Sequence, residues 1–148
     1  MNEFAWIQSI PWLLVVLGWY LVNRQNNSRE KRKELRALLD QTQKLLDEIE
    51  IQAVEYHTVE ATVQRAFFLK RALGLKLHQK FEILSKRSLE LRLCKKYHIE
   101  LRKAITLSNF DSAKYEKKEL SDQIIKDIWL AKDRLSHELE TCFVKEYD

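Results

Sequence analysis

Residues 35–66 read LRALLDQTQKLLDEIEIQAVEYHTVEATVQRA. Apolar side chains recur in this segment at alternating intervals of three and four residues, which is the period of one face of an α-helix. Leu39, Leu46 and Ala53 widen the apolar stripe on one side, which favours packing against more than one neighbouring helix. The segment therefore predicts a long helix whose apolar seam binds a second copy of the chain or a partner helix. The residues of this predicted association seam are Leu35, Leu38, Leu45, Ile49, Val59 and Val63.

The same spacing continues further along the chain and predicts a second helix at about residues 75–107. Gly74 is the expected bend before this helix. A lone glycine costs a helix only about 1 kcal/mol, so an unbroken rod over residues 28–107 stays open as an alternative. A weaker signal for a break lies at residues 85–88, which contain two serines.

A helix end is predicted at residues 108–111, which read SNFD, because Ser, Asn and Asp side chains compete with the helix for backbone hydrogen bonds. A third helix is expected to begin there, with Asp111 or Ser112 as its N-cap. The apolar stripe of this third helix is Leu120, Ile124, Ile128, Ala131, Leu135, Leu139 and Cys142, with Phe143 alongside.

The composition supports an all-α fold. The chain has 148 residues, of which 32% are charged, and it contains 2 Gly, 1 Pro and 2 Cys. Sheet-rich folds need turn-forming residues at most of their turns, and disulfide scaffolds need more cysteine. We therefore expect residues 35–148 to form a three-helix bundle or a coiled-coil hairpin.

Residues 4–22 read FAWIQSIPWLLVVLGWYLV and contain no charged side chain. As a helix they would extend about 28 Å, which matches the hydrocarbon core of a bilayer. Tryptophan and tyrosine near both ends suit the two headgroup boundaries. We expect residues 1–23 to form a single transmembrane anchor and residues 24–34 a basic juxtamembrane segment. The anchor residues that we single out are Phe4, Trp6, Trp12, Leu13, Leu14, Trp19 and Tyr20.

The basic residues that follow the apolar run predict its orientation. Six Lys or Arg side chains lie between Arg24 and Arg36, whereas the residues before the run carry only Glu3 and the amino terminus. The positive-inside rule then places the N-terminus outside and the C-terminal domain in the cytoplasm. A cleaved signal peptide is disfavoured because the start is acidic and no small-residue cleavage site precedes Arg24. A buried soluble helix is disfavoured because apolar residues surround the helix on all sides.

Charge is distributed in blocks. Residues 64–103 are strongly basic, whereas residues 37–63 and 111–148 are acidic overall. Antiparallel packing would let the basic helix face two acidic ones, and this reading is favoured over nucleic-acid binding because stacking aromatic side chains are not interleaved with the cations. An anionic ligand is the alternative. The side chains that would contact it include Lys70, Arg71, Lys86 and Arg87.

Metal and cofactor chemistry is not indicated. The pairs His57 with Glu60, His78 with Glu82, Cys94 with His98, and His137 with Cys142 each supply only two ligands, and no Glu-x-x-His motif is present. No cofactor and no catalytic site are therefore predicted. Cys94 and Cys142 lie on apolar stripes and are expected to be reduced thiols in the core.

Arg92 and His98, in RLCKKYH, are spaced as in the Arg-x(4-6)-His motif of the all-helical HEPN ribonucleases, which this segment resembles. The resemblance implies RNA cleavage by a dimer, with Arg92 binding phosphate and His98 handling the proton. Leu93 stands where those enzymes usually have a polar residue. The resemblance covers seven residues, so a ribonuclease is a lesser alternative.

The layout of the chain resembles that of phage inner-membrane spanins, which also have one N-terminal anchor and a helical domain. Spanins face the periplasm, which conflicts with the basic run after Val22. The layout is also similar to that of small anchored effectors of phage-defence and toxin systems, which perturb membranes. The favoured interpretation is a non-enzymatic, single-pass protein of a bacterial inner membrane, whose partners are lipids and copies of itself or partner helices.

Overall fold

A computed structural model describes residues 4–87, 89–107, 109–112 and 114–147, with side chains from residue 11 onward. The described residues form helices and loops without a strand, which confirms the all-α prediction. The elements are α1 (Phe4–Thr58), α2 (Val63–Arg71), the π-helix η1 (Ala72–Lys76), α3 (Leu77–Lys86), α4 (Arg92–Thr106) and α5 (Gln123–Tyr147).

The chain divides into two units, Met1–Leu35 and Arg36–Asp148. The described part of the first unit is the N-terminal portion of α1. The second unit contains the remainder of α1 and all the other helices.

In the second unit, the C-terminal part of α1 packs antiparallel to α5. Arg36 Nη1 lies 2.7 Å from Glu140 Oε2, and further along α1 Asp47 Oδ1 lies 2.7 Å from Lys132 Nζ. Residue numbers therefore rise along α1 while they fall along α5. The helical stretch from α2 to α3 also opposes α1, because Glu55 pairs with Arg65 whereas Gln41 lies beside Lys80.

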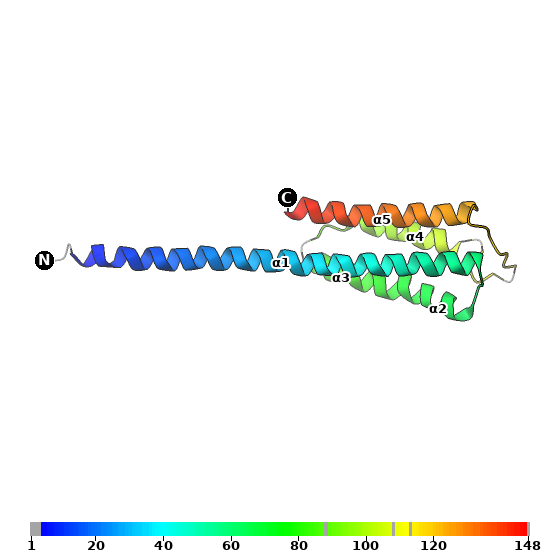
Figure 1. Cartoon of the computed structure of the whole chain (residues 1–148), viewed down its shortest axis with the longest axis horizontal. Helices are drawn as coiled ribbons and strands as arrows, with labels where there is room; N and C mark the ends of the chain where they lie inside the picture. The colour runs from blue at the N-terminus through cyan, green and yellow to red at the C-terminus, as the bar shows by residue number, and fades with distance from the viewer. Residues whose placement is uncertain (1–3, 88, 108, 113, 148) are drawn as a thin grey trace. The chain divides into compact units, whose positions relative to one another are not determined.

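Helix α4 completes the second unit and runs antiparallel to α5. The Sγ atoms of Cys94 and Cys142 are 3.9 Å apart, and Glu100, about 1.7 turns further along α4, lies 3.9 Å from Arg134. The four members α1, α2–η1–α3, α4 and α5 therefore alternate in direction as an up-and-down bundle (Figure 1). The prediction of a three-helix bundle or a coiled-coil hairpin gave too few helices, because the predicted second helix is split in two.

The predicted helix 75–107 is split between the end of α3 at Lys86 and the start of α4 at Arg92. The Arg87 amide bonds to the Leu84 carbonyl at the end of α3, and Leu89 and Leu91 are buried, so they fix the turn against the core. The weaker break signal at residues 85–88 therefore adjoins the observed break, although Ser85 lies inside α3 and residue 88 lies outside the described residues. Gly74 does not end a helix, because it lies inside a continuous helical path from α2 through η1 to α3.

The long seam predicted through residue 66 is interrupted at residues 59–62. Helix α1 ends at Thr58, and Thr62 begins α2 as its N-cap, accepting a 3.2 Å hydrogen bond from the Arg65 amide. The β-branched residues Thr58, Val59, Thr62 and Val63 weaken helix formation here, which is a signal that the uninterrupted apolar spacing concealed.

The third predicted helix begins later than expected. Helix α5 starts at Gln123, and the Asp122 carboxylate accepts a 3.1 Å hydrogen bond from the Ile124 amide. Asp111 instead lies in the preceding loop with a φ of 52°. The buried stripe of α5 begins at Ile125, whereas the predicted Leu120 is exposed.

Candidate functional site

The N-terminal part of α1 presents apolar side chains on all sides. From Trp12 to Val22 the large hydrophobic side chains are between 49% and 74% exposed, so none is covered by the protein. They include the predicted anchor residues Trp12, Leu13, Leu14, Trp19 and Tyr20. The side chains of the other two, Phe4 and Trp6, lie outside the described residues. Over the part of the chain that the structure describes, no helix combines the length and the apolar character needed to cross a membrane.

A polar and basic segment follows in the same helix. Residues 24–34 are helical and exposed, and the Ser28 hydroxyl donates a 3.0 Å hydrogen bond to the Arg24 carbonyl one turn earlier. The surface of α1 therefore changes at Asn23 from wholly apolar to wholly polar.

The predicted association seam is largely internal to the bundle. Leu35, Leu45 and Ile49 are buried within this single chain, and Leu38 is half-buried. Val59 and Val63 follow the end of α1 and are exposed. Most of the predicted seam is thus used for folding, and a second copy could reach only its two valines without opening the bundle.

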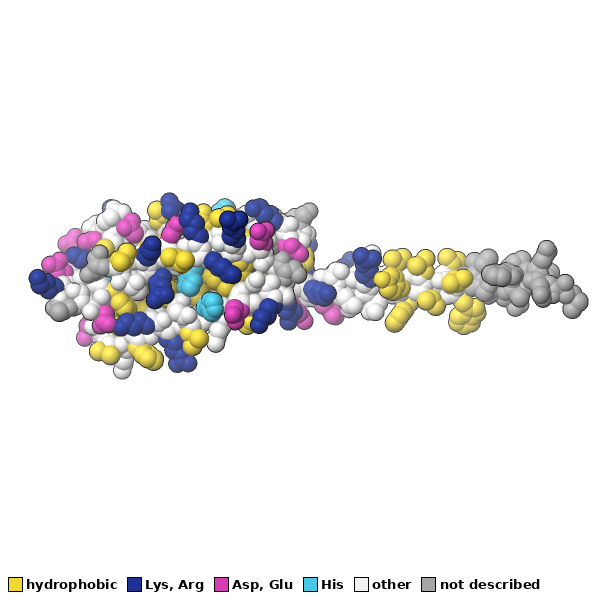
Figure 2. All heavy atoms as spheres, turned by 180° about the vertical axis from the view of Figure 1, so that it is seen from behind, with side chains coloured by type: hydrophobic (Ala, Val, Ile, Leu, Met, Phe, Trp, Pro, Cys, Tyr) yellow, Lys and Arg dark blue, Asp and Glu magenta, His cyan; other side chains and the backbone are white. Residues whose placement is uncertain are grey.

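The four cations proposed as anion contacts lie on exposed surface of α2, α3 and the turn after α3. Lys70 pairs with Asp111 and lies 5.8 Å from the Phe110 ring centroid, so its ammonium already has partners. Figure 2 shows Lys and Arg side chains spread over the bundle, with Asp and Glu side chains between them. Lys70, Arg71, Lys86 and Arg87 therefore do not converge on a built anion site.

Acidic side chains of α1 pair with a lysine of α5 as well as with the basic segment that was expected to face them. Lys132 of α5, whose side chain is largely buried, lies 2.7 Å from Asp47 and 3.2 Å from Glu50 of α1. Burial opposes the charge of Lys132, but the two carboxylates outweigh it and raise its pKa. Within the basic block, Arg65 pairs with Glu55 of α1.

A buried polar cluster connects Asn109 and Glu116, which lie between α4 and α5, to the end of α1. His57 Nε2 lies 3.1 Å from the Ile105 carbonyl, and its Nδ1 lies 3.4 Å from Asn109 Nδ2. Asn109 also donates to the Glu116 carbonyl at 2.8 Å and accepts from the Glu116 amide at 2.9 Å. A neutral imidazole with its proton on Nε2 satisfies both contacts, since Nε2–H then donates to Ile105 and Nδ1 accepts from Asn109.

Tyrosines complete this cluster. The Tyr115 hydroxyl donates to the Tyr56 carbonyl at 2.7 Å, and the Tyr56 hydroxyl accepts from the Asp111 amide at 2.9 Å. Burial lowers the pKa of His57, which keeps the imidazole neutral. The sequence predicted Asn109 only as part of a helix end. Its pairing with His57 depends on tertiary contacts that no local sequence pattern reveals.

Arg92 and His98 do not form a shared site. They are six positions apart on α4, which places them about 120° apart around the helix axis. His98 is half-buried, its Nε2 lies 2.8 Å from the Leu73 carbonyl, and its ring contacts Phe81 edge-on. Arg92 is exposed in the wall of a separate cleft. His98 therefore has a packing role, which removes the geometric support for the HEPN-like reading.

Both cysteines are buried thiols, as expected from their stripes. Cys142 lies against a cleft of about 650 Å³ between α4 and α5. Among the described residues no group of three or more His, Cys, Asp or Glu could hold a metal ion. Comparison with known proteins gives no further assignment: no family model matches the chain, and neither a curated protein nor a solved structure is significantly similar.

Proposed function

We propose that the chain is a non-enzymatic, membrane-anchored scaffold in which the apolar start of α1 inserts into a bilayer and a four-helix bundle is held at the cytoplasmic surface. The observation that carries the proposal is the run of exposed apolar side chains from Trp12 to Val22. A surface helix of a water-soluble protein normally keeps one polar face, and this segment has none.

The sequence around this run supports a lipid environment. The uncharged stretch begins at Phe4 and ends at Val22, so its full length is close to that of a bilayer core. Arg24 and the other cations after it would lie on the cytoplasmic side, where they also meet anionic headgroups. Burial of the run in lipid would remove the large apolar surface that the protein itself leaves exposed.

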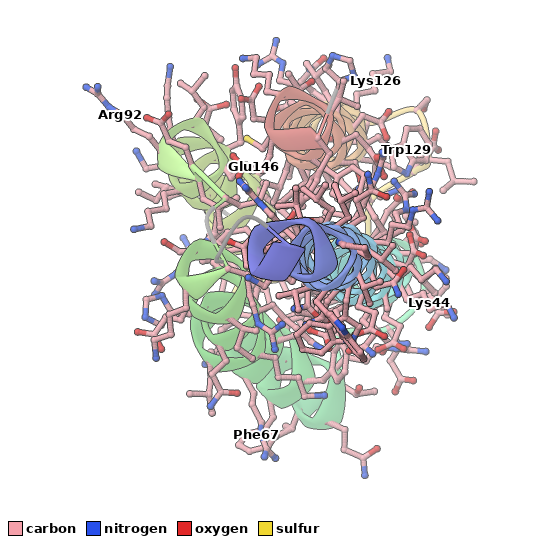
Figure 3. The ribbon with its side chains drawn as sticks, turned by 90° about the vertical axis from the view of Figure 1, so that its left-hand side faces the viewer. Lys44, Phe67, Arg92, Lys126, Trp129 and Glu146 are labelled. Carbon is pink, nitrogen blue, oxygen red and sulfur yellow. The ribbon has the colours of Figure 1, made fainter. Side chains whose placement is uncertain are left out.

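The bundle would supply the binding function of the scaffold. Since most of the seam on α1 is buried, a partner must bind to the outside of the bundle. The side chains of Phe67 in α2 and Trp129 in α5 point outward from the bundle (Figure 3), and Phe67 is 64% exposed. Phe67 and Val63, one turn apart on α2, form an apolar edge for such a contact.

The anchor is tested by charge insertion with a matched control. Leu14→Asp combined with Val16→Asp places two carboxylates in the run, whereas Ile51→Asp combined with Leu130→Asp places two carboxylates at exposed apolar positions of the bundle. The wild type and the bundle variant should remain with the membrane after alkaline extraction, and the anchor variant should be released. A soluble wild-type chain, or an anchor variant that stays with the membrane, would refute the proposal.

Orientation needs an exposed probe, because Cys94 and Cys142 are both buried. Ser121→Cys, in a chain with both native cysteines changed to serine, places a single thiol at an exposed loop position. A membrane-impermeant thiol reagent should label it only after the cells are permeabilised. Labelling of intact cells would favour the spanin-like orientation.

Expression of the same anchor variants separates the scaffold from the membrane-perturbing alternative. A scaffold should leave growth and membrane integrity unchanged when the wild type is expressed at a high level. Growth arrest or dye leakage that disappears in the Leu14→Asp and Val16→Asp chain would assign the effector role instead.

A further inference from the structure

Two thiols meet where α4 packs against α5. Cys94 lies in the first turn of α4 and Cys142 near the C-terminal end of α5, and their Sγ atoms are 3.9 Å apart. Either thiol could donate to the other across this contact. A disulfide bond requires about 2.0 Å between the sulfurs, so a modest change of side-chain rotamers would bring them into bonding range.

The two thiols differ in access. Cys94 is completely buried, whereas Cys142 is 9% exposed and lines the cleft of about 650 Å³ between α4 and α5. Cys142 Sγ also lies 3.1 Å from the Glu90 carbonyl, which holds it at the junction between the cleft and the core. A reagent that enters the cleft therefore meets Cys142 first and can reach Cys94 only through it.

The cleft has room for a small molecule and a polar lining. Arg92 and Lys145 supply cations, and Glu90 and Glu138 supply carboxylates. A peptide-like reagent that carries both ammonium and carboxylate groups fits such a lining better than an apolar one.

We propose that Cys94 and Cys142 form a reversible modification site whose substrate is a low-molecular-weight peptide disulfide. Cys142 loses its proton to solvent and attacks one sulfur of this reagent, which releases one thiolate and leaves a mixed disulfide on Cys142. Cys94 then loses its proton and attacks the Cys142 sulfur, which releases the second thiolate. The two protein thiols are oxidised to one disulfide, and the reagent is reduced to two thiols.

The new bond would tie the start of α4 to the end of α5. Residues 94–142 would then form a closed loop, and thermal unfolding should shift to higher temperature. Burial raises the pKa of both thiols, so the exchange is slow at neutral pH and accelerates as pH rises. Reduction would restore the starting state.

The test uses the full chain purified in detergent, with oxidised glutathione as the probe at about pH 8.5, where exchange is faster. The wild type should lose two hydrogen atoms in its intact mass and become resistant to a thiol-alkylating reagent. Cys94→Ser should stop at the mixed disulfide and gain one glutathione, because no second thiol completes the exchange. Cys142→Ser should stay unmodified, because Cys94 is not reachable from the cleft.

Two readouts make the inference falsifiable even if a serine variant folds poorly. Helical circular dichroism before treatment identifies a misfolded variant, and the wild type is informative by itself. Two glutathiones on the wild type, or two free thiols after exposure to the probe, would overturn the proposal. Modification of a folded Cys142→Ser chain would also overturn it, since the order of attack would be wrong.

Discussion

Helix α1 contains two apolar segments that the protein treats in opposite ways. From Trp12 to Val22 the large apolar side chains surround the helix and are all exposed. From Leu35 to Tyr56 the apolar side chains follow the helical period, and one stripe of them is buried. Both segments are regular helix, so local structure does not distinguish them.

The difference lies in the arrangement of the apolar residues around the helix axis. A stripe with a polar reverse side can be buried by neighbouring helices while its other face stays in water. A segment that is apolar on every side would need complete enclosure, and the large apolar side chains from Trp12 to Val22 are exposed. The comparison therefore predicts that the two segments respond differently to the same substitution.

The largest effect is expected from a carboxylate in the buried stripe. Ile49→Asp places a charge at a fully buried position, and we expect the free energy of unfolding to fall by on the order of 4 kcal/mol, enough to open a marginally stable bundle. Leu14→Asp, in the exposed segment, should leave the stability of the bundle unchanged. Urea unfolding followed by circular dichroism measures both variants.

A result in which Leu14→Asp unfolds the bundle as Ile49→Asp does would show that the two segments share one core. Ile51→Asp provides the control within the same helix, because Ile51 is two residues from Ile49 yet 55% exposed. We expect it to retain the wild-type unfolding midpoint.

Two histidines of the bundle, His57 and His98, should make its stability sensitive to acid. Burial lowers the pKa of His57 and of His98 in the folded chain. Below about pH 6.5 the unfolded chain therefore binds more protons at these two histidines than the folded chain does. The free energy of unfolding should therefore be highest above that pH and fall as the pH drops towards 5, by up to about 1.4 kcal/mol per pH unit for each histidine. Urea midpoints at stepped pH values measure this slope.

His57→Gln separates the contribution of the cluster from that of His98. The variant should show a shallower pH dependence, because one of the two buried imidazoles no longer titrates. An identical slope in the variant and the wild type would mean that His57 does not gain its proton on unfolding in this range.

Thr62 caps α2 directly after the interruption between α1 and α2. Thr62→Ala removes the hydroxyl that accepts from the Arg65 amide, and we expect a loss of about 1 kcal/mol of unfolding free energy. Thr62→Ser retains the acceptor and should stay close to the wild type. Equal losses for alanine and serine would assign the effect to the methyl group of threonine instead.

The smallest effect, and the only stabilising one, is expected at Gly74. It is helical and exposed, and a Cβ added there would meet nothing within 4 Å. Gly74→Ala should therefore raise the unfolding free energy by about 0.5–1 kcal/mol. A loss of stability would show that the backbone of the π-helix requires glycine at this position. Steric crowding could not explain such a loss, because the space around Gly74 is open.

For the candidate residues, the sequence predicts which side chains share an apolar stripe, and the tertiary structure shows what each stripe contacts. The helical period identified Leu35, Leu45 and Ile49 as seam residues, but it could not tell whether the seam faces a second chain or the same one. The structure buries them within one chain. The contact between the two cysteines likewise joins stripes whose spacing was visible, whereas their register across α4 and α5 was not.

The sequence by itself determined that the chain is helical and that its start is apolar on every side, because both properties follow from the periodicity and composition of short windows. Only the tertiary structure decided the number of helices in the bundle, the end of α1 at Thr58, and the pairing of His57 with Asn109. The physical reason is that the breaks between α1 and α2 and between α3 and α4 interrupt a seam whose spacing continues across both. Their positions depend on which distant side chains the turns can bury and bond.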